Sequence, residues 1–205
     1  YFGMIQKYGD VPWYDRELGS NDQELYKPRD SREYVMQKMI ADIDIAIENL
    51  PSQKDVYKIT RWTALALKSR FCLFEGTFRK YHSITQYEND ADDYLNLAAA
   101  ASYKFITESG YTIAAESGDP EKNYRSLFTS INAKNAEVIL ARDYNAELGL
   151  THSSGNSFNS ATMGRYGMNK KVVASYLMKD GSRFTDISGW ETMSFMDEVK
   201  DRILL

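Results

Sequence analysis

Residues 30–51, DSREYVMQKMIADIDIAIENLP, give the strongest indication of the fold. Apolar side chains recur there at intervals of three and four residues, which is the spacing of one face of an α-helix. They are Met36, Met39, Ile40, Ile43, Ile47 and Leu50. We expect Asp30 to cap the start of this helix and Glu33 to complete a capping box. Pro51 should end it, because the residue before a proline avoids helical dihedral angles.

Two further helices follow the first. Thr60 is a suitable N-cap for the second helix, because its hydroxyl can accept a hydrogen bond from a free backbone N–H. The apolar residues that we expect this helix to bury on more than one side are Ala64, Ala66, Leu67, Phe71, Cys72, Leu73, Phe74 and Phe78. The third helix is predicted from about residue 90 to 109, with Gly110 as its stop.

Three long helices joined by short or moderate loops predict stacked helical hairpins of the TPR kind over residues 1–110. Residues 111–205 are richer in loops, and we expect them to form an irregular region with a few short strands. The expected strands are 111–113 and 137–141, and the expected short helices are 124–128, 172–178 and 195–199. Residues 145–168 are predicted to be a long loop. The predicted fold class is therefore mainly α.

The composition disfavours several classes of function. The chain has 205 residues with 25 basic and 29 acidic side chains, a formal charge of -4 that does not suit sequence-independent binding of nucleic acid. Its single cysteine, Cys72, excludes a disulfide within the chain and a multi-cysteine zinc site. The two histidines, His82 and His152, do not stand in a metal-binding spacing. We therefore expect no cofactor and assign no metal-ligating residue. A calcium site with oxygen ligands among the acidic loops stays an open alternative, although no EF-hand pattern marks one.

No catalytic motif is present in the sequence. A nucleophile elbow, a phosphate-binding loop, a dinucleotide fingerprint and a zinc-peptidase motif are all missing. A glycosidase would need two facing carboxylates, and no pair of the acidic residues stands in a recognisable catalytic pattern. We therefore predict that the protein is not an enzyme.

Seven short segments, spread over nearly the whole chain, form a recognisable series. They are KYGDVPW (7–13), RDS (29–31), DIDIAIENLP (42–51), TRWTALALKSR (60–70), SGY (109–111), NAEVIL (135–140) and YLMKDG (176–181). In this order and spacing they resemble an internal part of the SusD/RagB family of nutrient-binding outer-membrane lipoproteins. Thr60 departs from the family pattern, which usually has Gly there.

The resemblance implies a SusD-like fold of TPR-like hairpins with a loop-rich ligand-binding part. It implies a cell-surface protein of Bacteroidetes-type bacteria, held at the outer membrane by an N-terminal lipid that lies outside this stretch. It also implies a partner, a TonB-dependent SusC-like transporter, to which the protein delivers its ligand. The ligand class of the family is usually glycans, and sometimes peptides or other nutrients.

Sugar binding requires flat aromatic faces together with planar polar groups that bond to hydroxyls. The residues that we expect to bind the ligand lie in the loops of the second half and after the Gly-Asp-Val-Pro turn. They are Tyr144, Asn145, Arg165, Tyr166, Trp190, Trp13 and Tyr14. Trp13 and Tyr14 have two further interpretations, because they could contact the transporter or anchor their turn to the helical core. The alternative function is a helical scaffold that binds only proteins or peptides.

Overall fold

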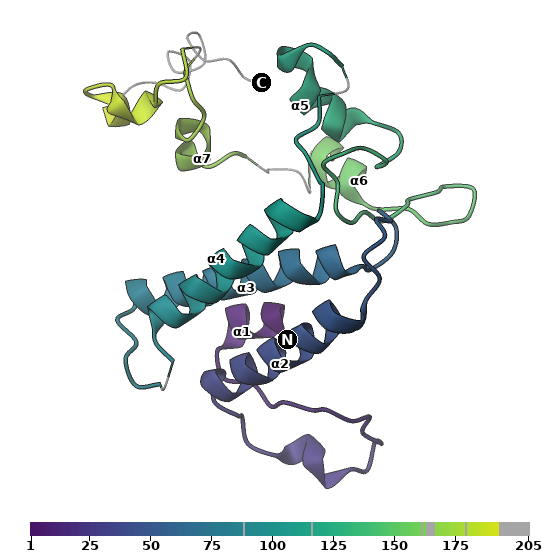
Figure 1. Ribbon diagram of the computed structural model, residues 1–205, viewed down its shortest axis with the longest axis vertical. Coiled ribbons are helices and arrows are strands. Elements are labelled where there is room, and N and C mark those ends of the chain that lie inside the picture. Colours follow the sequence, from purple (N-terminus) through teal and green to yellow (C-terminus); the bar gives the residue numbers. More distant parts are fainter. Residues whose placement is uncertain (88, 116, 161, 163–166, 179, 193–205) are drawn as a thin grey trace. The chain divides into compact units, whose positions relative to one another are not determined.

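The structure is a computed structural model that describes residues 1–87, 89–115, 117–160, 162, 167–178 and 180–192 (Figure 1). These residues contain seven α-helices, which confirms the mainly helical class expected from the sequence. The helices are α1 (Phe2–Tyr8), α2 (Arg32–Asn49), α3 (Arg61–Tyr81), α4 (Ala91–Glu108), α5 (Pro120–Thr129), α6 (Ser154–Asn159) and α7 (Lys170–Ala174). Three short 3-10 helices are η1 (Gln23–Tyr26), η2 (Phe184–Asp186) and η3 (Trp190–Thr192).

The chain divides into two compact units. The first unit comprises Tyr1–Ile113 and Ala133–Arg142, and the second comprises Ala114–Asn132 and Asp143–Leu205. The first unit contains helices α1 to α4, and the second contains α5 to α7 with η2 and η3. Within the described ranges, no helix is both long enough and apolar enough to cross a bilayer.

Helix α2 begins one residue later than the sequence suggests. Its N-cap is Ser31, whose hydroxyl accepts a hydrogen bond from the N–H of Tyr34 at 3.3 Å. Asp30 instead accepts a bond from the backbone N–H of Trp13 at 2.7 Å and pairs with Lys27 at 2.9 Å. The expected capping box with Glu33 is therefore wrong, because both carboxylates are engaged with distant parts of the chain.

The predicted starts of α3 and α4 are confirmed. Thr60 and Thr63 form a reciprocal capping box at the start of α3. Asp90 and Asp93 form another at the start of α4, where the Asp90 carboxylate accepts bonds from two backbone N–H groups. These local bonds satisfy backbone N–H groups that the first turn of a helix leaves free. Because they involve residues close in the chain, the sequence alone located the starts of both helices.

Helix α3 is the centre of the first unit, with α2 packed on one side and α4 on the other (Figure 1). At Gly76 a Cβ atom would stand 2.7 Å from the Leu95 Cγ and 2.8 Å from the Ala91 carbonyl oxygen, so only glycine allows this close approach of α3 and α4. Buried Ala98 and Ala101 line the same contact from the side of α4. Small residues thus bring the two helices together.

Two apolar clusters fill the first unit. The larger one contains Ile5, Val11, Trp13, Val35, Met36, Met39, Phe71, Cys72, Tyr94 and Ala98. The smaller one contains Ile47, Trp62, Ala64, Leu65 and Ala101. The expected packing role of Met36 and Met39 is thereby confirmed.

The expectation that α3 buries Leu67 and Leu73 is wrong. Leu67 is 42% exposed and Leu73 is 51% exposed, whereas Leu65 is only 3% exposed. Since α2 and α4 both pack on α3, its buried face is set by those neighbours, and Leu65 and Cys72 lie on it. Helix α3 has more apolar residues than α2 and α4 cover, so Leu67 and Leu73 stay exposed.

The expected short strands are absent from the described residues. Extended segments near 111–113 and 133–142 make single backbone bonds instead of a ladder: Thr112 N–H donates to the Ala136 carbonyl at 3.1 Å, and Ala141 N–H donates to the Val56 carbonyl at 2.8 Å. The segment 133–142 thus bonds once to residue 112 and once to residue 56, and the series of bonds between two strands that makes a sheet does not form.

The second unit is built of short elements. Helix α5 contains the helical turn expected at 124–128, and α7 covers the first part of the one expected at 172–178. The segment expected as a continuous loop, 145–168, contains α6. The short helix expected at 195–199 lies outside the described residues.

We predict that Leu65→Ala lowers the free energy of unfolding by about 2–5 kcal/mol, because it leaves a cavity in the core. Leu67→Ala, two positions away on the exposed face, should change it by about 0.5 kcal/mol or less. Urea denaturation followed by circular dichroism measures both. Equal losses for the two variants would contradict this assignment of the buried face.

Candidate functional site

The best candidate for a ligand site is a hollow of about 450 Å³ in the second unit, which we call the Trp190 hollow. Its walls come from α7, from the turn that follows it, and from η2 and η3. The lining residues are Lys171, Ala174, Ser175, Leu177, Arg183, Thr185 and Trp190. The hollow thus combines an indole ring with two cationic side chains and two hydroxyl groups.

Helix α7 forms one wall of the hollow, and both of its ends are fixed by local structure. The Asn169 side chain caps its start by accepting a bond from the Lys171 N–H at 2.9 Å. After α7 the chain reverses, and Leu177 and Arg183 form an isolated antiparallel bridge. Gly181 makes this reversal possible with its positive φ of 83°. The reversal brings Arg183 back beside α7.

Trp190 is held in place by the short helices that follow. Phe184 is 3% exposed, and the Trp190 ring packs edge-on against it with centroids 6.2 Å apart. The Trp190 backbone N–H donates to the Ile187 carbonyl at 3.2 Å. Trp190 itself is half-buried, so part of its ring is accessible from the hollow. A fixed indole beside exposed hydrogen-bond donors suits a ligand with both apolar and polar faces.

The other candidates of the second unit do not line this hollow. Tyr144 is 47% exposed and packs edge-on against His152, with centroids 4.7 Å apart. The Asn145 side-chain oxygen accepts bonds from the N–H groups of Glu147 and Leu148, so it organises its own turn. Arg165 and Tyr166 lie outside the described residues.

Trp13 and Tyr14 take structural positions. Trp13 is 7% exposed and its ring lies 4.3 Å from that of Tyr1, so it offers no free face to a ligand. It is a core residue, and the expectation of a ligand role is corrected. The Tyr14 hydroxyl donates to the Glu24 carbonyl at 2.9 Å, and Lys27 stands over its ring at 4.9 Å. Tyr14 therefore braces the loop before α2.

Sequence reasoning overlooked Lys171, Arg183 and Thr185. The available signal was Asp180-Gly181, a dipeptide typical of tight turns between extended segments. Interpreted as a chain reversal and not only as the stop of a helix, it would have predicted that Arg183 returns toward α7.

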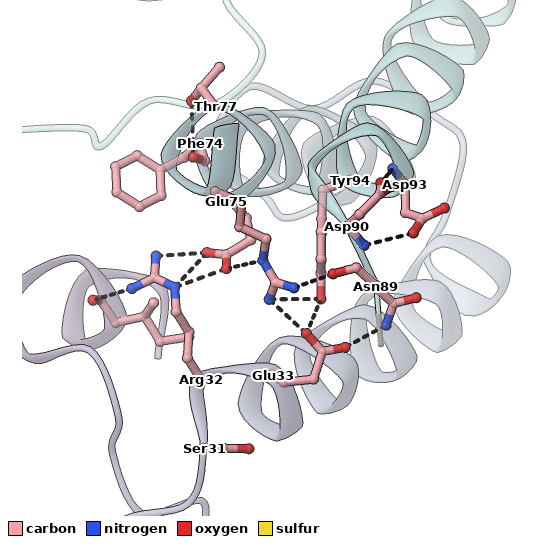
Figure 2. A network of polar contacts seen from close by, with 12 residues as sticks. Ser31, Arg32, Glu33, Phe74, Glu75, Thr77, Asn89, Asp90, Asp93 and Tyr94 are labelled. Carbon is pink, nitrogen blue, oxygen red and sulfur yellow. Dashed lines mark hydrogen bonds and ion pairs between the residues drawn. The ribbon is translucent and has the colours of Figure 1, made fainter. Parts of the chain in front are cut away.

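A second group of polar residues lies inside the first unit, where four charged side chains are buried together (Figure 2). Glu75 is 0% exposed and lies between two arginines. Arg32 Nη2 stands 2.7 Å from one of its oxygens, and Arg79 Nε stands 2.8 Å from the other. Arg79 also pairs with Glu33 at 2.7 Å. Two cations and two anions balance, so the cluster carries no net charge.

Neighbouring groups complete this network. Tyr94 donates its hydroxyl hydrogen to Glu33 at 3.3 Å, and Asn89 donates from its amide to the other oxygen of Glu33. Arg32 reaches the carbonyl of Ile5 at 3.3 Å, and its guanidinium lies 4.1 Å from the Phe78 ring centroid. The network therefore connects α1, α2, α3, α4 and the loop before α4.

The network serves stability. Burial alone would raise the pKa of Glu33, but hydrogen bonds from Asn89 and Arg79 and the charge of Arg79 outweigh it and hold this pKa below its ordinary value. Burial raises the pKa of Tyr94, which stays neutral and able to donate. Because Glu75 and Arg79 are closed to solvent, these groups bind each other and not a ligand.

The structure favours neither a reactive thiol at Cys72 nor, in the residues that it describes, a metal site. Burial raises the pKa of the Cys72 thiol to about 12, so it stays protonated and unreactive at neutral pH. In the part of the chain that the structure describes, His, Cys, Asp and Glu side chains form no group of three or more suited to a metal ion.

Comparison with known proteins gives no relative. No protein-family model, no curated protein and no solved structure matches the chain. Function must therefore be argued from the residues themselves and from the resemblance of the seven segments.

We predict that Glu75→Gln lowers the free energy of unfolding by about 3–5 kcal/mol, because it leaves two buried arginines short of negative charge. The control is Lys80→Gln, which breaks the exposed Lys80–Asp92 pair of 3.6 Å and should cost about 0–1 kcal/mol. Urea denaturation distinguishes the two. A Glu75→Gln protein as stable as the control would show that the buried charges do not depend on one another.

The pH dependence of stability tests Glu33. Its pKa is lower in the folded state than its ordinary value of 4.5, so the unfolded chain binds the proton more readily. The stability that Glu33 contributes is present above pH 4.5 and is lost as the pH falls through the folded pKa. In Glu33→Gln the free energy of unfolding should fall less steeply with acidification than in the wild type. Parallel curves would contradict the shifted pKa.

Proposed function

We propose that this protein binds glycans at the cell surface and delivers them to a TonB-dependent SusC-like transporter. The observation that carries the proposal is the Trp190 hollow, where one accessible indole ring meets side chains that donate hydrogen bonds. The resemblance of the seven segments to the SusD/RagB family supports the same function. The role proposed is that of a binding protein and not of an enzyme.

The chemistry of a sugar ring matches this hollow. The C–H groups on one face of a pyranose are apolar and pack on an aromatic ring, which Trp190 provides. The hydroxyls around the ring need donors and acceptors, and Arg183, Lys171 and Thr185 are exposed in the same walls. A shallow site with exposed walls also suits a chain of sugars, because the polymer can continue beyond the bound residue.

The helical unit fits the rest of the proposal. Helices α2, α3 and α4 pack in sequence, each joined to the next by a loop, which is the arrangement that TPR-like hairpins require. In this proposal the helices dock on the transporter and the loop-rich unit meets the glycan. An N-terminal lipid outside the present stretch would anchor the protein at the outer membrane.

A helical scaffold for peptides is the second candidate, and one observation favours it. Two hollows, of about 290 and 180 Å³, are lined by residues of α2 and α4, and Leu97 contributes to both. Ile40 and Tyr94 line the larger one, while Ile47 and Ala101 line the smaller. An apolar peptide could place side chains there. Both hollows are smaller than the Trp190 hollow, so the glycan proposal has the stronger support.

The test is affinity electrophoresis of the 205-residue chain against a panel of soluble polysaccharides, with a non-binding reference protein. We predict that at least one polysaccharide retards the wild type. Trp190→Ala should weaken that binding by about tenfold or more, with a Tm within about 4 °C of the wild type because the ring is only half-buried.

Tyr26→Ala is the matched control, because Tyr26 is an aromatic residue that is 80% exposed in the first unit. It should bind as the wild type does. If no polysaccharide retards the wild type, the glycan proposal is contradicted and the scaffold is favoured. If Trp190→Ala loses stability but keeps its affinity, Trp190 is a packing residue and not a ligand residue.

A further inference from the structure

The Trp190 hollow has an unusual balance of charge for this protein. Acidic residues outnumber basic ones by 29 to 25 in the whole chain. The described lining of the hollow reverses that balance, because it contains Lys171 and Arg183 and no acidic residue. The site therefore concentrates positive charge on a chain that is negative overall.

The two cations of the hollow have no carboxylate partner in the part of the chain that the structure describes. Among the described residues, no carboxylate lies within ion-pair distance of the Lys171 ammonium or the Arg183 guanidinium. Asp180, in the turn between them, accepts bonds from the backbone N–H and the hydroxyl of Ser182 at 2.9 and 2.6 Å.

Two other lysines that the structure describes in the same unit are engaged. Lys122 pairs with Asp119 at 2.8 Å, and Lys170, next to Lys171 on α7, donates to the Glu191 carbonyl at 2.8 Å. Unlike these two lysines, Lys171 and Arg183 have side-chain donor hydrogens that no described residue accepts, so these hydrogens are available to a ligand.

We infer that the Trp190 hollow takes an acidic sugar, whose ring packs on Trp190 and whose anionic group is bound by Arg183 and Lys171. This inference rests on the proposed glycan function and specifies its ligand class. The anionic group is a carboxylate, as in a uronic acid, or a sulfate ester. The planar guanidinium of Arg183 can donate two parallel bonds to either group, and Lys171 adds a point charge.

The geometry also explains why a neutral sugar would be the poorer ligand. A neutral sugar would bring its hydroxyls to two cations without cancelling their charge. An anionic group gains attraction from both cations and forms charge-assisted hydrogen bonds, which are about twice as strong as neutral ones. Because the walls of the hollow are exposed, this attraction should weaken as salt is added.

The experiment is affinity electrophoresis of the 205-residue chain in paired gels that differ only in the charge of the polysaccharide. One pair contains pectate and highly methyl-esterified pectin, which differ in free carboxylates. The other contains dextran sulfate and dextran, which differ in sulfate esters. Mobility is compared with that in a gel without polysaccharide, so a charge change in a variant does not affect the result.

The variants are Arg183→Gln and Lys171→Gln, with Lys122→Gln as the control that removes the same charge elsewhere in the unit. We expect pectate or dextran sulfate to retard the wild type more strongly than its neutral counterpart. Arg183→Gln should weaken that binding by about tenfold, the loss of one charge-assisted interaction, while Lys122→Gln leaves it unchanged. The pair that gives retardation distinguishes carboxylate from sulfate.

Three outcomes would overturn the inference. Equal retardation by the charged and neutral polymers, unaffected by Arg183→Gln, would leave the glycan function standing with a neutral ligand. Equal weakening by Lys122→Gln and Arg183→Gln would show attraction to overall charge and not to this hollow. Absence of retardation in all four gels, and with the wider panel of polysaccharides, would remove the proposed function itself.

Discussion

The buried carboxylate of Glu75 is the constraint on which the helical unit depends. An ion taken from water into a protein interior loses several kcal/mol of solvation, and this carboxylate is 0% exposed. Only the two arginines on either side of it make that burial tolerable. Because Arg32 and Glu33 belong to the start of α2 and Glu75 and Arg79 to α3, the Arg32–Glu75 and Arg79–Glu33 pairs join these two helices. Ion pairs and apolar contacts together therefore hold α2 against α3.

The sequence predicted the features of the fold that depend on near neighbours. Thr60, Asp90 and Pro51 act within a few residues, so the starts of α3 and α4 and the end of α2 were visible in the chain. The cap of α2 was misplaced because Asp30 bonds to Trp13, 17 positions away. The exposure of Leu67 was missed for a similar reason: the buried face of α3 is determined by which helices pack on it, and periodicity alone does not identify them.

The candidate site was predicted in part. Trp190, which follows Gly189 at the start of η3, is half-buried and lines the hollow, while its binding role stays a prediction. Arg183 and Lys171 were missed because only the reversal at Gly181 brings them to one hollow. Trp13 shows the opposite case, since an aromatic residue after a turn proved to be core. An aromatic residue in a loop therefore becomes a site residue only when the chain leaves one face of its ring open.

The central claim is that a glycan covers Trp190, and tryptophan fluorescence tests it most directly. Trp13 and Trp62 are 7% and 5% exposed, so Trp190 is the one tryptophan of three whose ring is accessible to a dissolved quencher. The measurement is acrylamide quenching of the wild-type chain with and without each soluble polysaccharide. We predict that a polysaccharide that retards the chain also lowers the quenchable fraction of the tryptophan fluorescence. Retardation with unchanged quenching would place the bound glycan elsewhere and contradict the claim.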